Sequence, residues 1–120
     1  MSRLCALLIG FILAGTCQNS SAYESRGARS CEGWLQSNQD EKSGYPRNSE
    51  IYQTWLIGYL SGIVAGSGTD FLVGTDSESA FRMVDIYCSE NPTMNLAGAG
   101  TYVARLLMQQ KGIPHVPTLP

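Results

Sequence analysis

Few residues in this chain are of types that do chemistry in proteins. Among 120 residues there are four cysteines and one histidine. His115 lies in a proline-rich segment near the C-terminal end, whereas a catalytic histidine needs an orienting partner and a rigid support. One histidine and cysteines that are expected to be paired cannot supply a zinc ligand set. The sequence therefore predicts no catalytic residue, no metal site and no cofactor.

Carboxylates are the remaining candidates for acid–base chemistry. Asp76 and Glu78 stand in the first turn of an expected helix, where capping and the helix dipole account for acidic residues. Asp85 differs because it borders an expected apolar helix face, four residues after Phe81 and three before Cys88. An acid–base group or a partner-binding anchor would suit this position, but no second catalytic group is visible beside it. We therefore expect Asp85 to be a structural acceptor for a tyrosine hydroxyl, an indole N–H or a helix end.

The N-terminal residues have the pattern of a secretory signal peptide. Arg3 supplies a positive charge, residues 4–14 form an apolar run, and small residues follow. The run is shorter than the roughly 20 apolar residues of a transmembrane helix. Ser20-Ser21-Ala22 suits a signal peptidase, which predicts removal of residues 1–22 and a periplasmic or secreted protein.

A lipoprotein signal competes with this interpretation. Cys17 would then carry the lipid anchor, although Thr16 occupies the position where the small residue before the cysteine belongs.

The formal net charge of −2 becomes about −3 when Arg3 is removed. Such a charge provides no basic footprint for nucleic acid and no polybasic membrane patch.

Only two of the four cysteines, Cys31 and Cys88, remain after cleavage before Tyr23. In an exported protein, the pair Cys31 and Cys88 indicates one disulfide, with two free buried thiols as the alternative. Closing so long a loop would stabilise the fold by roughly 4 kcal/mol in the chain-entropy model.

The central element that must position these residues is an expected helix over residues 49–66. Spacing of four places two rows of large apolar residues on one broad helix face: Ile51, Trp55, Tyr59 and Ile63, and beside them Tyr52, Leu56, Leu60 and Val64. A neighbouring ridge with Gly58 and Gly62 carries almost no side chain. Because glycine costs roughly 0.5–1 kcal/mol in a helix, we expect another backbone to pack closely there.

Three further helices are predicted, over residues 30–39, 75–90 and 94–111. Cys31 and Trp34 share a face of the first, and Thr75 with Glu78 forms a capping box at the start of the second. The fold class is therefore all-α: a compact bundle of about four helices with one disulfide over residues 23–113. Residues 114–120 form a proline-rich tail.

Two loops are expected to contact a partner. Residues 39–48 contain Tyr45 and Arg47, and the connection after the central helix contains Asp70 and Phe71. Aromatic and arginine residues on loops of a rigid scaffold are common interface anchors. Phe71 has an alternative role as an apolar plug of the bundle.

Three motifs together resemble a known group of small exported proteins from Gram-negative bacteria. They are Cys31-x-x-Trp34, Trp55-Leu56-x-Gly58-Tyr59-Leu60-Ser61-Gly62, and Asp85-x-Tyr87-Cys88-x-x-Asn91-Pro92. The group is similar to the type VI secretion immunity proteins of the Tai and resistance-associated class, and more distantly to acid-stress chaperones of the HdeA type. The resemblance implies a periplasmic all-α protein with a disulfide and no catalysis, in which the motif residues are structural.

The expected function is that of a non-catalytic binding protein, such as an immunity protein or inhibitor of an exported effector. Its partner would be another exported protein, and a second copy of the chain is a further candidate. The alternatives are an acid-stress chaperone-like protein and a small secreted hydrolase or accessory enzyme using Asp85. One histidine and 15% charged residues offer little for a pH-triggered chaperone.

Overall fold

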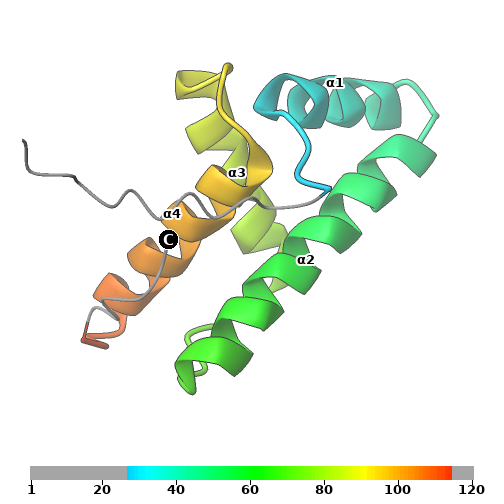
Figure 1. The fold of residues 1–120 in the computed structure, drawn as a ribbon. Coiled ribbons are helices and arrows are strands. Elements are labelled where there is room, and N and C mark those ends of the chain that lie inside the picture. Colours follow the sequence, from blue (N-terminus) through cyan, green and yellow to red (C-terminus); the bar gives the residue numbers. More distant parts are fainter. Residues whose placement is uncertain (1–26, 115–120) are drawn as a thin grey trace, which may run out of the picture.

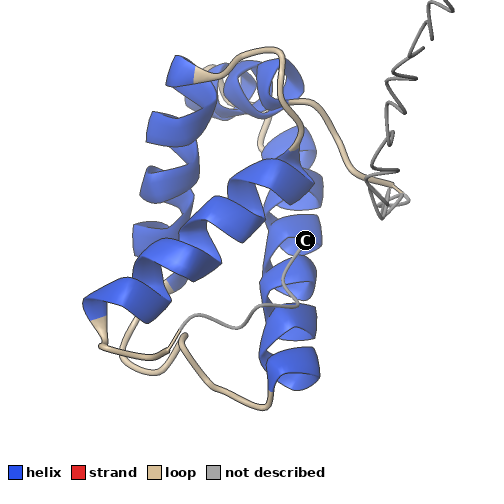
Figure 2. Cartoon of the chain, turned by 60° about the vertical axis from the view of Figure 1, so that its left-hand side comes forward, coloured by secondary structure: helices blue, strands red, loops and turns tan. Residues whose placement is uncertain are grey.

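Four α-helices form the part of the chain that the computed structural model describes, residues 27–114 (Figure 1). Their bounds are Cys31–Lys42 (α1), Arg47–Ser67 (α2), Ser77–Glu90 (α3) and Leu96–Gln110 (α4). Only loops join them, and no strand occurs between residues 27 and 114 (Figure 2). The predicted all-α bundle is thus confirmed. The expected signal peptide over residues 1–22, Cys17 and the tail from His115 onward lie outside the described residues.

The first two helices are longer than expected. Ser30 caps α1 by accepting a hydrogen bond from the Gly33 N–H (3.0 Å). The helix continues past Gln39 to Lys42 because no residue stops it before Gly44, whose φ of 93° suits glycine. Proline is compatible with the start of a helix, and α2 begins directly after Pro46. The expected loop over residues 39–48 is therefore confined to a short turn.

Side-chain caps begin the last two helices. Asp76 caps α3 by accepting from the Ser79 N–H (2.7 Å), and Asn95 caps α4 by accepting from the Gly98 N–H (2.9 Å). The expected capping box from Thr75 is not formed, since aspartate is the stronger capping residue. The Thr75 hydroxyl instead accepts a hydrogen bond from Lys111, just after α4.

The Cys31–Cys88 disulfide is present and joins the start of α1 to α3. The two Cα atoms are 5.0 Å apart, and both side chains are fully buried. Two backbone hydrogen bonds fasten the same end of α1 to the start of α4: Cys31 N–H to Met94 O and Leu96 N–H to Arg29 O, each 2.8 Å. The disulfide is thus part of a junction of three helices.

The core lies between α1 and α4. Each of these two helices packs against both α2 and α3. Its largest fully buried side chains come from all four helices and one loop: Trp34, Leu56, Leu60, Phe71, Val84, Leu96, Val103 and Met108. Phe71 belongs to the connection between α2 and α3 and has no exposed surface. Of the two roles expected for Phe71, the apolar plug of the bundle is therefore the one observed. The expected role as a partner anchor is wrong, because the side chain is not on the surface.

The expected close packing at Gly58 and Gly62 is also wrong. Both residues are exposed, and a Cβ atom added to either would meet no atom within 4 Å. The close approach occurs at Gly100 in α4, where a Cβ atom would lie 2.6 Å from Cδ1 of Tyr59. The N-terminal half of α4, which consists mostly of glycine and alanine, packs against α2. It receives the Tyr59 ring because the apolar face of α2 points inward, while the ridge with Gly58 and Gly62 points outward.

Candidate functional site

Asp85 accepts two side-chain hydrogen bonds from α1. The indole Nε1–H of Trp34 donates to Asp85 Oδ1 at 2.6 Å, and the amide Nδ2–H of Asn38 donates to the same oxygen at 2.8 Å. The indole was one of the three donors considered from the sequence. Among the described residues no nucleophile is bonded to this carboxylate, so its observed contacts are those of a positioned acceptor.

These residues lie in a groove between α1 and α3, here called the α1–α3 groove. Its volume is about 380 Å³, and α2 contributes one side chain to it. Trp34 is buried at its floor, and the Phe81 ring stands edge-on to the indole with centroids 5.8 Å apart. The full lining comprises Trp34, Asn38, Glu41, Lys42, Gln53, Glu78, Phe81, Arg82 and Asp85. Aromatic, amide and charged groups therefore meet in one concave surface.

Most of the charged residues on the rim are accounted for by their own helices. Glu78 lies in the first turn of α3 and Lys42 in the last turn of α1, where each complements the helix dipole. The Arg82 guanidinium donates to the Ser79 hydroxyl at 2.9 Å. Glu41 and Asp85 have no such local explanation, because Glu41 is at the negative end of α1 and Asp85 lies in the middle of α3.

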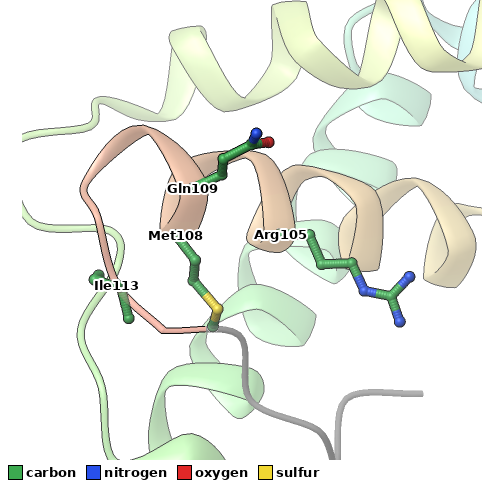
Figure 3. Close-up of a pocket in the computed structure, with 4 residues that line it drawn as sticks. All are labelled: Arg105, Met108, Gln109 and Ile113. Carbon is green, nitrogen blue, oxygen red and sulfur yellow. The ribbon is translucent and has the colours of Figure 1, made fainter.

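A second hollow, of about 500 Å³, lies at the C-terminal end of α4. Its described lining is Arg105, Met108, Gln109 and Ile113. The guanidinium of Arg105 extends away from Met108 and Ile113 (Figure 3). Although this hollow is larger, the described part contributes no aromatic ring and no carboxylate. The α1–α3 groove is therefore the better candidate site.

The expected partner-binding residues are not brought together into one site. Tyr45 is 72% exposed in the turn between α1 and α2, and Arg47 is the exposed first residue of α2. Asp70 is exposed but accepts a hydrogen bond from the Leu72 N–H (3.0 Å), which shapes its own turn. With Phe71 buried, only Tyr45 and Arg47 remain next to each other on the surface.

The other motif residues make contacts between and within helices. Tyr59 stacks on Trp55 (centroids 5.2 Å apart), and its hydroxyl pairs with that of Thr101 in α4 at 2.8 Å. Tyr87 contacts the ring of Tyr102 (5.0 Å between centroids). Asn91 ends α3 and donates from its side-chain amide to the Tyr87 carbonyl at 2.9 Å, while Pro92 is exposed in the following turn.

Five lining residues of the groove were not among the candidates from the sequence: Asn38, Glu41, Lys42, Gln53 and Arg82. Asn38 lies four residues after Trp34, which places both on one face of α1, and this spacing is the signal that would have found it. Glu41 and Gln53 offer no comparable signal. Gln53 reaches the groove from α2, and only the packing of α2 beside α1 decides that.

Between residues 27 and 114, no three histidine, cysteine, aspartate or glutamate side chains are grouped so that they could hold a metal ion. In the same range, no helix has both the length and the apolar character needed to cross a membrane. No protein-family model, curated protein or solved structure matches this chain. Class and site therefore rest on the residues themselves: a disulfide-linked four-helix domain with a mixed aromatic and polar groove.

Proposed function

We propose that this chain is a non-catalytic binding protein that captures another exported protein through the α1–α3 groove. The observation that carries the proposal is the groove itself, in which buried Trp34 and partly exposed Phe81 lie beside Asp85 and the Asn38 amide. Aromatic residues with a few positioned polar groups in a concave surface are typical of binding sites. The wall of the groove is held by a disulfide and by side-chain hydrogen bonds, which limits the entropy lost on binding.

Within this class, immunity to an exported effector is the role that we favour. It is supported by the three sequence motifs that resemble immunity proteins of the Tai and resistance-associated class. A gene beside this one that encodes a cell-wall-degrading effector is the expected genetic context. Loss of acid survival on deletion, without loss of protection from an effector, would point to the chaperone-like role instead.

Affinity capture from the cell envelope, followed by binding of the purified pair, tests the proposal. Glu41→Arg changes an exposed residue in the last turn of α1 and places a cation in the groove, so capture should be lost. Glu90→Arg makes the same change in the last turn of α3, outside the lining, and is the matched control. Capture that survives Glu41→Arg but is lost with Tyr45→Ala, Arg47→Ala or Asp70→Ala would move the contact surface to the loops.

An activity assay decides whether the protein is a binding protein or an enzyme. Purified protein that hydrolyses a cell-wall or ester substrate, with the activity abolished by Asp85→Asn, would sink the binding hypothesis. We expect no turnover from the wild type or from this variant.

A further inference from the structure

We infer that the α1–α3 groove takes up an arginine side chain of the partner, between Asp85 and Glu41. The inference rests on the proposed function, because it names the chemical group that the bound protein would insert. Three features of the groove carry it: an acceptor atom left on Asp85, the position of Glu41, and the ring of Phe81.

Asp85 has an oxygen that is not used within the described residues. Both of its side-chain donors, Trp34 and Asn38, end on Oδ1, so no donor between residues 27 and 114 bonds Oδ2. A carboxylate has about four acceptor positions on its two oxygens. The side chain is partly buried in the middle of α3 and has no cation paired with it in this range. It is therefore suited to a charged donor that enters the groove.

Glu41 provides a second carboxylate from the opposite wall. It lies in the last turn of α1, where the helix dipole disfavours a negative charge. Its neighbour Asp40 is compensated there by hydrogen bonds from the Gln36 and Asn48 side chains, but the Glu41 carboxylate has no hydrogen bond or ion pair within the described residues. A cationic ligand would remove this unfavourable interaction.

The remaining lining favours a guanidinium over an ammonium group. The partly exposed Phe81 ring offers a face for stacking, and the side chains of Asn38 and Gln53 bring amide oxygens from two further positions. A guanidinium is planar and has five donors, so it can stack on a ring while bonding several acceptors, whereas an ammonium has three donors and no plane. Of the two cations of the lining, Arg82 donates to the Ser79 hydroxyl, and Lys42 complements the helix dipole in the last turn of α1.

The test is an NMR titration of the purified protein with Nα-acetyl-argininamide, with the citrulline analogue as the uncharged control. A single side chain makes few contacts, so weak binding, in the millimolar range, is expected. The Trp34 indole signal and the side-chain amides of Asn38 and Gln53 should shift with the arginine probe and not with citrulline. Glu41→Gln should weaken binding by about tenfold, the effect of losing one charge-assisted interaction.

Matched variants keep the experiment decisive. Glu90→Gln, on the last turn of α3 and outside the groove, should leave probe affinity unchanged. Asp85→Asn retains an acceptor for Trp34 and should also weaken the probe about tenfold. Absence of binding, equal binding of both probes, or an affinity unaffected by Glu41→Gln would overturn the inference. If the arginine inference fails in this way but a partner is still captured through the groove, the proposed function stands. If the arginine probe binds but no partner is captured, the proposed function is overturned and the arginine site stands.

Discussion

The indole Nε1–H of Trp34 donates to Oδ1 of Asp85 at 2.6 Å, across 51 positions of the sequence. Trp34 lies one helical turn after Cys31, and Asp85 lies one turn before Cys88. The hydrogen bond and the disulfide therefore join α1 to α3 in the order of an antiparallel pair. Together they hold the two walls of the groove at a set separation.

Asp85→Ala is expected to destabilise the protein, because it leaves the buried indole N–H of Trp34 without its acceptor. Loss of a hydrogen bond to a charged group costs about 1.5–3 kcal/mol. Asp85→Asn should cost less, since the amide oxygen still accepts from the indole. Urea unfolding of both variants measures the difference, and an unchanged midpoint for Asp85→Ala would show that the bond contributes no net stability.

Removal of the disulfide should lower the stability of the fold by more than removal of the Trp34–Asp85 hydrogen bond. The double variant Cys31→Ala, Cys88→Ala lacks the cross-link and is expected to lose roughly 4 kcal/mol, the chain-entropy contribution of a loop of this length. Thermal unfolding of wild type and variant measures the loss. A reductant should lower the melting temperature of the wild type and leave that of the variant unchanged, and thiol labelling of the denatured, unreduced wild type should modify neither Cys31 nor Cys88.

Two glycine-to-alanine changes should alter the free energy of unfolding in opposite directions. Gly62→Ala adds a methyl group where no atom lies within 4 Å, so the better helix propensity should stabilise the protein by about 0.5–1 kcal/mol. Gly100→Ala adds it 2.6 Å from the Tyr59 ring, and overpacking should cost about 1–3 kcal/mol. Chemical denaturation of the pair is the measurement. Destabilisation by Gly62→Ala would show that the exposed ridge of α2 is covered in solution.

Asp76 makes the start of α3 sensitive to acid. The backbone N–H of Ser79, followed by the Ser79 side chain and the charge of Arg82, holds the pKa of this carboxyl below its ordinary value of 3.8. A depressed pKa in the folded state means that the cap contributes stability above the ordinary value and loses it as the pH falls through the lowered pKa. NMR titration of the Asp76 carboxyl should show that lowered value, and Asp76→Asn should remove this part of the acid sensitivity.

The four helices and the Cys31–Cys88 disulfide could be predicted from the sequence, because the helices follow from local patterns and the disulfide from the number of cysteines. Apolar residues three and four apart define α2 whatever packs on it, and the two cysteines left by the expected removal of residues 1–22 have one way to pair. The helix ends were less well predicted, since Pro46 and Asp76 compete with nearby serine and threonine residues that are also good starting signals.

What only the tertiary structure decided is which surfaces of these helices meet. Gly58 and Gly100 are both small residues in helices, and a glycine is equally compatible with solvent and with a packed ring. The α1–α3 groove likewise joins side chains from three helices, and neither Gln53 nor Glu41 has a sequence pattern that indicates the other. The sequence determined the period of each helix and hence its apolar face. The angle and register at which those faces cross depend on the packing of all side chains at once, and this crossing placed Tyr59 on Gly100 and Asp85 beside Trp34.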